Sequence, residues 1–143
     1  MWSNMPANLM EYFNRQPRIG TLSTAGRDGK VDVAPMGSPR MVDEKTVVMA
    51  LAENRTLANL RENPHAVYMI MVPGQGIFDW KGVRVYLKMR SCETSGEGIE
   101  RMKREISKAI GEAAAGMLRA AVTFEVEEVR PIVDMGQGWE KSI

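Results

Sequence analysis

The protein has 143 residues and a formal net charge of +1, with 44% apolar and 26% charged residues. This length fits one domain with one hydrophobic core, which we place at residues 1–143. A near-zero net charge excludes the strong positive field of a nucleic-acid-binding protein, and no run approaches the roughly 20 apolar residues of a membrane helix. We therefore expect neither nucleic acid nor a membrane as a partner.

The chain has one histidine, His65, and one cysteine, Cys92. A Cys/His zinc site takes about four ligands, so we expect no metal site. His65 follows Pro64 with no nucleophile near it in the sequence, so we interpret it as a structural or surface residue and assign no catalytic residue. The single cysteine and the lack of a secretory signal pattern favour the cytoplasm. Any redox chemistry is then expected from a bound cofactor.

Apolar periodicity, prolines and turn residues divide the chain into short elements. The pair Asp28-Gly29 favours a hairpin between the first two strands, and Pro35 with Gly37 predicts a bend, a bulge or a sheet edge at the end of the second. In chain order we expect a helix over 6–15, strands over 18–24, 30–36 and 46–52, a helix over 55–62, strands over 66–72 and 82–90, a helix over 96–111 and a strand over 120–129.

This division gives six strands and three helices, with no repeated strand–helix–strand unit. The strand over 66–72 is almost wholly apolar and is expected at the centre of a sheet. The strands over 82–90 and 120–129 alternate apolar and polar residues, as half-buried antiparallel strands do. We predict a mainly β fold, a closed or nearly closed antiparallel barrel of six strands with helical insertions. The tail over 136–141 is expected to be mobile or to dock on a partner.

The stretch LAENRTLANLRENP, residues 51–64, joins a buried strand to a short helix that stops at a proline. Asn54 or Thr56 can cap this helix. Its N-terminus would present unpaired backbone N–H groups beside the permanent charge of Arg55 and the hydroxyl group of Thr56. Two interpretations fit the pattern: a phosphate-binding site, or a capped helix with a solvated arginine.

Three stretches resemble the FMN-binding split β-barrel family, which includes pyridoxamine 5′-phosphate oxidase and the small FMN-binding proteins of sulfate-reducing bacteria. They are TLSTAGRDGKVDVAPMGS (21–38), VVMALAENRTLANLRENPHAVYMIM (47–71) and GQGIFDWKGVRVYLKMRS (74–91). Together with the order of the elements, the resemblance extends over residues 9–132. It implies a six-stranded split barrel, FMN as the cofactor, and a homodimer with the flavin at its interface.

The resemblance implies a role for each matching position. Arg55 takes the place of the phosphate-binding arginine, and Arg55-Thr56 matches the Lys-Thr pair of the small FMN-binding proteins. Residues 33–38 line the ring, and Met49-Ala50 replaces a Tyr-Thr pair of the oxidases, so one hydroxyl group is lost. The aromatic side chains of the loop over 73–80 can stack on the ring or belong to ordinary packing. The predicted cofactor-binding residues are Val33, Ala34, Pro35, Met36, Gly37, Ser38, Met49, Ala50, Asn54, Arg55, Thr56, Gly76, Phe78 and Trp80.

The residues that bind the substrate phosphate in the oxidases have no counterpart that we can place, so the resemblance does not extend to vitamin B6 oxidation. We predict a homodimeric FMN-binding oxidoreductase or electron carrier with a small-molecule or protein redox partner. The loop over 76–80 and the region of Trp139 are candidates to reach the flavin of the other subunit. Two alternatives stay open: a split-barrel reductase that binds the deazaflavin F420, and a non-catalytic flavin-binding or storage module.

Overall fold

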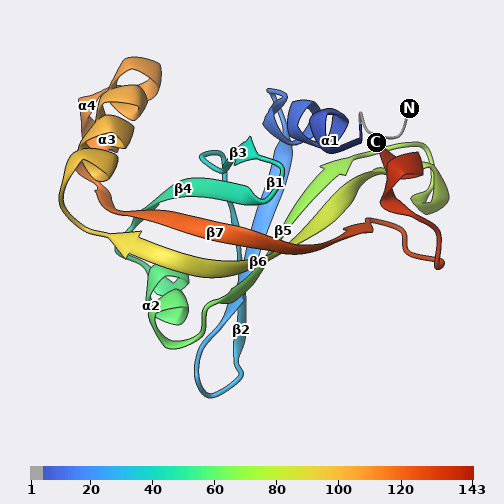
Figure 1. Ribbon diagram of the computed structural model, residues 1–143, viewed down its shortest axis with the longest axis horizontal. Helices are drawn as coiled ribbons and strands as arrows, with labels where there is room; N and C mark the ends of the chain where they lie inside the picture. Colours follow the sequence, from blue (N-terminus) through green and yellow to red (C-terminus); the bar gives the residue numbers. More distant parts are fainter. Residues whose placement is uncertain (1–4) are drawn as a thin grey trace.

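The structure of the protein is a computed structural model that describes residues 5–143, with side chains from residue 9 onward. Its long strands form one twisted sheet with helices at both ends (Figure 1). The elements in chain order are α1 (Met5–Asn14), β1 (Ile19–Ala25), β2 (Val31–Pro35), β3 (Arg40–Asp43), β4 (Thr46–Ala52), α2 (Arg55–Glu62), β5 (His65–Val72), the 3₁₀ helix η2 (Ile77–Asp79), β6 (Lys81–Glu93), α3 (Glu97–Ile110), α4 (Glu112–Gly116), β7 (Leu118–Pro131) and the 3₁₀ helix η3 (Trp139–Ser142).

The sheet has seven strands in the order β2-β1-β5-β6-β7-β4-β3, and each neighbouring pair is antiparallel. The expected six strands are therefore wrong by one. The additional strand is the four-residue β3, of which Arg40, Met41 and Asp43 pair with β4. Only Met41 of this strand is buried, so the sequence carried no alternating pattern for it. Strands β2 and β3 are the two edges of the order, and among the described residues their hydrogen bonds do not close the sheet into a barrel.

The core fills the concave side of the sheet, because every second side chain of a strand points to the same face. On β5 the inward residues are Ala66, Tyr68 and Ile70, which are 5%, 0% and 2% exposed. Helix α1 adds Phe13, whose ring lies 5.3 Å from the ring of Tyr68. The largest fully buried side chains are Tyr68, Phe13, Phe124, Leu22, Met41, Met49, Leu51, Leu57, Leu60, Leu87, Ile99 and Val47.

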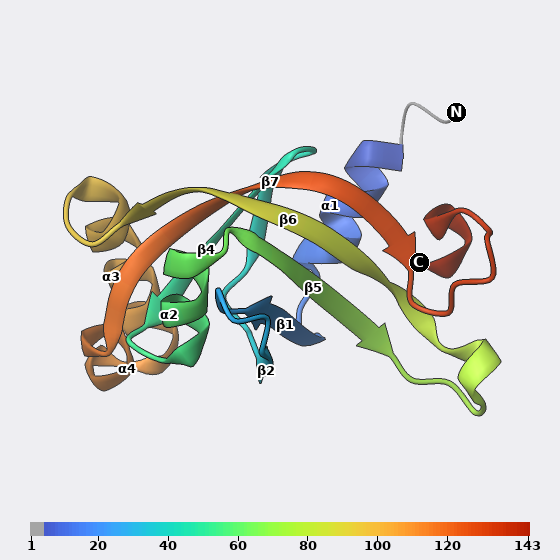
Figure 2. The same ribbon diagram turned by 90° about the horizontal axis from the view of Figure 1, so that it is seen from below.

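The helices occupy three separate places around the sheet (Figures 1 and 2). Helix α1 lies at one end of the long strands, and α3 with α4 lies at the opposite end. Helix α2 packs against the hairpin of β1 and β2, where Asn59 Nδ2 donates to Thr24 Oγ1 over 3.1 Å. The sequence predicted α1, α2 and α3 close to their observed bounds, and it missed the short α4.

The C-terminal segment packs on its own chain, so the expectation of a mobile tail is wrong, and its docking on a partner stays a prediction. Trp139 and Ile143 pack against the core. Asp134 accepts hydrogen bonds from Arg84 Nη2 over 3.0 Å and from Arg130 Nε over 2.5 Å. These contacts hold the segment between β7 and η3 against the ends of β6 and β7. None of the described helices is long and apolar enough to cross a membrane.

Candidate cofactor site

Two of the predicted ring-lining segments meet through one side chain. The Ser38 hydroxyl group donates to the Ala50 carbonyl over 3.1 Å and accepts from the Ala50 N–H over 3.2 Å. Ser38 thereby occupies a hydrogen-bonding position beside β4, two residues before the start of β3. The structure thus brings the end of residues 33–38 beside Ala50 near the end of β4, five residues before the start of α2.

The predicted ring-lining residues present an apolar edge. On β2, Val33 is 62% exposed and Pro35 is exposed as well, because β2 is an edge strand and these side chains point away from the core. Met36 is partly buried against the core, and Gly37 is exposed. Ala34 is half-buried on the opposite face of the strand from Val33. This edge presents apolar side chains and, at Gly37, bare backbone. Such a surface fits the face of a tricyclic ring.

Met49 and Ala50 lie on opposite faces of β4. The Met49 side chain is 0% exposed and belongs to the core, so only its backbone is available to a ligand. Ala50 is 7% exposed and faces α3. A small cavity of about 50 Å³ separates that face from the helix. Its lining residues are Ser38, Arg40, Val48, Ala50, Met102, Glu105 and Ile106.

The N-terminus of α2 offers donors for an anion. The side chain of Asn54 caps the helix by accepting from the Leu57 N–H over 3.1 Å, and its carbonyl accepts from the Ala58 N–H over 3.0 Å. The N–H groups of Arg55 and Thr56 are left at the helix start, where the helix contributes a partial positive charge. The Arg55 side chain is exposed and makes no ion pair among the described residues. Thr56 is only 2% exposed, so it is a buried residue of this helix start.

Three charged residues that the sequence did not single out surround this helix start. Glu53 accepts a two-pronged hydrogen bond from Arg61, over 2.7 and 3.3 Å, and lies 3.6 Å from Arg119 Nε. The hydrogen bond from Arg61 lowers the pKa of the Glu53 carboxyl group, so it is ionised at neutral pH. Because two arginines accompany this carboxylate and Arg55 is unpaired, the local balance of charge is positive. Arg61 belongs to α2 itself, whereas Arg119 belongs to β7. No pattern in the sequence predicts that Arg119 lies near Glu53.

The helix and the ring-lining edge are held together through the β1–β2 hairpin. The Arg27 N–H donates to Glu62 Oε1 over 2.8 Å, which adds to the bond between Asn59 and Thr24. A β-carbon at Gly26 would lie 3.1 Å from polar atoms of both Asn59 and Glu62, so the hairpin approaches the helix closely. Helix α2 and the β1–β2 hairpin therefore belong to one packed unit. Within it, Arg55 and the two N–H groups fit a phosphate monoester, and the β2 edge fits a flat ring.

Gly76, Phe78 and Trp80 lie at the other end of the β5–β6 hairpin from α2 (Figure 1). The eight residues of β5 separate the two places by roughly 25 Å along the strand. Phe78 is 75% exposed, which excludes the alternative that it packs in the core of its own chain. In one chain these three residues do not join the site at Arg55. Their contact with a flavin therefore stays a prediction that requires a second chain.

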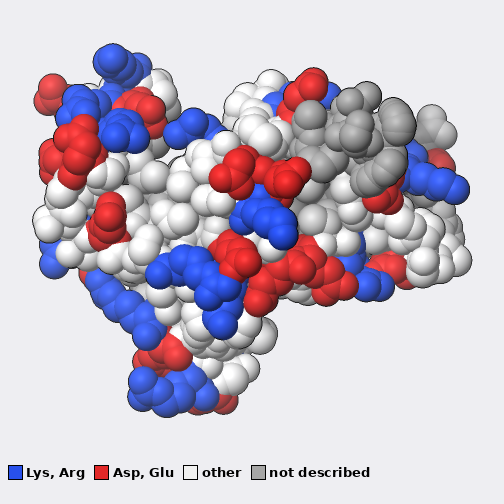
Figure 3. Space-filling model, in the orientation of Figure 1, with Lys and Arg blue, Asp and Glu red and all other residues white. Residues whose placement is uncertain are grey.

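His65 is a surface residue, as expected. It lies on the outer face of the sheet at the start of β5, and its Nδ1 is 3.4 Å from Glu127 Oε1. The described residues contain no cluster of three or more His, Cys, Asp or Glu side chains that could hold a metal ion. Lys and Arg alternate with Asp and Glu over the face shown in Figure 3, without a continuous field of one sign.

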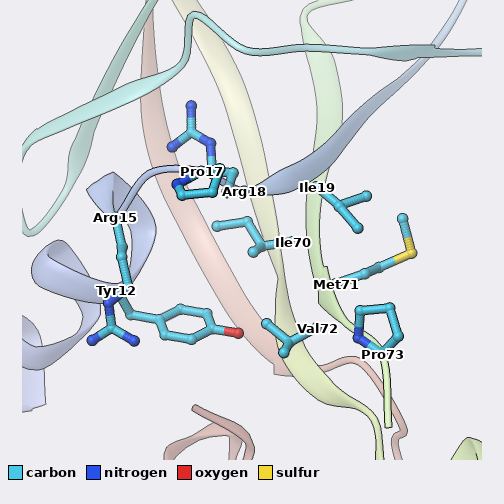
Figure 4. A pocket seen from close by; sticks show the side chains of 9 residues that line it. All are labelled: Tyr12, Arg15, Pro17, Arg18, Ile19, Ile70, Met71, Val72 and Pro73. Atoms are coloured by element: carbon cyan, nitrogen blue, oxygen red, sulfur yellow. The ribbon is translucent and has the colours of Figure 1, made fainter.

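A separate cavity of about 310 Å³ lies between α1 and the ends of β1 and β5 (Figure 4). Its walls are mostly apolar, and none of the predicted cofactor-binding residues lines it. The hydroxyl group of Tyr12 points toward Val72 in this view, whereas the Arg18 guanidinium points upward, beside Pro17. That direction leads toward the connection between β2 and β3.

Comparisons with known proteins agree on the kind of fold. The sequence profile of the family described as pyridoxamine 5′-phosphate oxidase matches residues 7–132. No curated protein matches the sequence. An FMN-binding protein from Syntrophomonas wolfei subsp. wolfei superposes with a TM-score of 0.76 at 22% identity, covering 91% of this chain and 90% of that chain.

Two further solved structures show how widely ligands vary on this fold. HutZ, described as the heme storage protein from Vibrio cholerae, matches with a TM-score of 0.62 at 16% identity, over 93% of this chain and 96% of its own. A protein described as an F420 reductase matches with a TM-score of 0.63 at 13% identity, over 83% and 94%. At these identities the likeness establishes the fold alone.

Proposed function

This chain belongs to the pyridoxamine 5′-phosphate oxidase family, and from that premise we propose that it is a cytoplasmic flavoprotein that binds FMN at the interface of a homodimer. The proposal rests on one observation, that the β2 edge and the N-terminus of α2 are connected through β4. Ser38 fixes the β2 edge beside the end of β4, and β4 leads directly into the α2 N-terminus with its free Arg55. A phosphate end and a ring edge therefore adjoin on one rigid unit.

Each feature has a defined part in the proposal. The Arg55 guanidinium and the N–H groups of Arg55 and Thr56 hold the phosphate, and the β2 edge lies along the ring. The exposed Phe78 and the half-buried Trp80 contact the flavin of the other subunit. Bound FMN supplies hydride or electron transfer, and the chain binds it, orients it and excludes water. The protein is then an oxidoreductase or an electron carrier with a small-molecule or protein redox partner.

A second chain is part of this proposal because one chain leaves both sides of the site open. Val31 and Val33 are 84% and 62% exposed on the outer face of the edge strand β2. Two large apolar side chains on such an edge favour a covering partner. A homodimer that covers this face also brings the loop over 76–80 of one chain toward the site of the other.

The first test is the visible spectrum of freshly purified protein, with chromatography of the ligand released by heat. FMN is the expected product. Release of F420 or heme, the ligands named for two neighbours of this fold, would replace FMN in the proposal. A colourless protein that takes up no added FMN would contradict it.

The second test assigns the phosphate to Arg55. Arg55→Ala is expected to weaken FMN binding by about 1.5–3 kcal/mol, the scale of a charged hydrogen bond. Riboflavin, which lacks the phosphate, should bind the parent and this variant equally. Arg101→Ala on the exposed side of α3 is the matched control and should leave both affinities unchanged. Equal losses for FMN and riboflavin would show that Arg55 acts on something other than the phosphate.

A further inference from the structure

Side-chain hydrogen bonds to three backbone carbonyls hold the connection between β2 and β3 in place. Tyr68 Oη donates to the Met36 carbonyl over 2.8 Å. Arg18 Nη2 donates to the carbonyls of Gly37, over 3.0 Å, and Pro39, over 2.5 Å. The Met36 N–H donates to the Gly20 carbonyl over 3.0 Å. A segment with a glycine and two prolines around it, which would otherwise be free to move, is thus anchored at each end.

Arg18 uses both of its terminal nitrogens for this task, whereas its Nε is buried without a hydrogen-bond partner among the described residues. Its Nη1 donates to the Phe13 carbonyl at the end of α1, and its guanidinium lies 5.3 Å from the ring centroids of both Phe13 and Tyr68. Among the described residues no carboxylate pairs with it. Burial lowers the pKa of Arg18 from its ordinary value, and the neighbouring Tyr68 partly offsets this shift. Arg18 is also one of the residues that line the cavity between α1 and the ends of β1 and β5 (Figure 4).

The same segment leaves two donors without an acceptor. Pro35 and Pro39 have no N–H, and the Met36 N–H is bonded to Gly20. The N–H groups of Gly37 and Ser38 make no hydrogen bond among the described residues. They belong to the stretch that adjoins Ala50 through the Ser38 hydroxyl group, so they lie at the proposed ring site.

We propose that Arg18, together with Tyr68, is a positioning residue that holds the N–H groups of Gly37 and Ser38 as fixed donors to the flavin ring. This inference rests on the proposed function. Donors already fixed in place lose little freedom when the ring binds, which favours affinity. They also stabilise the negative charge of reduced flavin more than the neutral oxidised ring, which raises the midpoint potential of the bound flavin.

The chemistry requires arginine at position 18. Its planar fork reaches three carbonyls on two elements at once, and it stays charged while partly desolvated. A lysine keeps the charge but is a single point donor on a flexible stem, so it cannot hold Phe13, Gly37 and Pro39 together. Arg18→Lys therefore tests the geometry of the guanidinium group while the positive charge is kept.

The test uses the full chain with three variants. Arg18→Lys removes the fork, and Tyr68→Phe removes only the bond to Met36. Arg84→Gln is the control, because Arg84 also ties a distant segment to the sheet, through the Pro131 carbonyl and Asp134, far from the proposed ring site. The readouts are FMN affinity by fluorescence quenching, the midpoint potential of bound FMN, and amide hydrogen exchange of residues 36–39 in FMN-free protein.

Arg18→Lys is expected to weaken FMN binding about tenfold, as a small misplacement of binding groups does, and to shift the midpoint potential to a more negative value. It should also speed amide exchange at Gly37 and Ser38. Tyr68→Phe should act in the same direction, and Arg84→Gln should change none of the three. If the parent binds FMN but Arg18→Lys and Tyr68→Phe both behave like Arg84→Gln, the inference is wrong and the proposed function stands. If the parent binds no FMN, the proposed function falls and the inference falls with it.

Discussion

A β-carbon at Gly20 would lie 2.0 Å from the hydroxyl oxygen of Tyr68. The ring of Tyr68 therefore passes over β1 where only a glycine leaves room, and this passage lets its hydroxyl group reach the Met36 carbonyl. Gly20→Ala is expected to destabilise the protein by about 1–3 kcal/mol, because the core is already filled and the ring must move. Chemical denaturation measures this loss.

The control for that change is Gly116→Ala, since a β-carbon at Gly116 meets nothing within 4 Å. It should leave the free energy of unfolding unchanged or slightly higher. If Gly20→Ala unfolds at the same denaturant concentration as this control, Tyr68 does not occupy the position described.

The sequence predicted best what local chemistry decides. Helix α2 has its observed bounds because Asn54 caps it and Pro64 follows its end. The strand β3 escaped prediction because one buried residue, Met41, cannot produce an alternating pattern. The α4 helix escaped because its five residues carry no apolar face of their own.

At the candidate site, the sequence motif predicts the phosphate position, and the family resemblance predicts the ring edge. The residues that hold these two parts of the site in place do so through contacts between positions far apart in the sequence. Arg18 precedes a strand and reads as a solvated residue, yet its acceptors Gly37 and Pro39 lie 19 and 21 positions away. Arg119 reaches Glu53 only because β7 pairs with β4. No local pattern predicts such pairs.

Glu53 lies two residues before Arg55, next to the proposed phosphate position. Glu53→Gln is expected to tighten FMN binding about two- to fivefold at low ionic strength, because it removes a negative charge and leaves Arg61 and Arg119 uncompensated. Added salt should reduce the gain. Affinity titrations at two salt concentrations measure it, with Glu44→Gln in the β3–β4 turn as the control. Weaker binding in Glu53→Gln would mean that the ion pair matters by holding Arg61 in place.

The proposed dimer depends on the outer face of β2. Val31→Asp is expected to shift the protein to monomer in light scattering, because the dimer would have to bury an unpaired carboxylate. Val42→Asp on the opposite edge strand, β3, changes a side chain that is 41% exposed and should leave the dimer intact. A dimer that survives Val31→Asp but not Val42→Asp would place the interface at the other edge of the sheet.

The attachment of the C-terminal segment should depend on pH through Asp134. The hydrogen bond from Arg130, with a further one from the Gly136 N–H, holds the pKa of this carboxyl group below its ordinary 3.8. A depressed pKa means that the ionised form is favoured in the folded state, so its contribution to stability is complete above the ordinary value. That contribution is lost as the pH falls below 3.8 through the folded value.

Asp134→Asn should reproduce the effect at neutral pH, since the amide cannot form the ion pairs with Arg84 and Arg130. Amide exchange of residues 134–143 is expected to speed up in this variant at pH 7 and in the parent only at acid pH. Asp43→Asn serves as the control, because that carboxylate accepts from the Lys45 N–H in the β3–β4 turn and its pKa is lowered as well. If Asp134→Asn leaves exchange in residues 134–143 as slow as in the parent, the packing of Trp139 and Ile143 alone holds the segment.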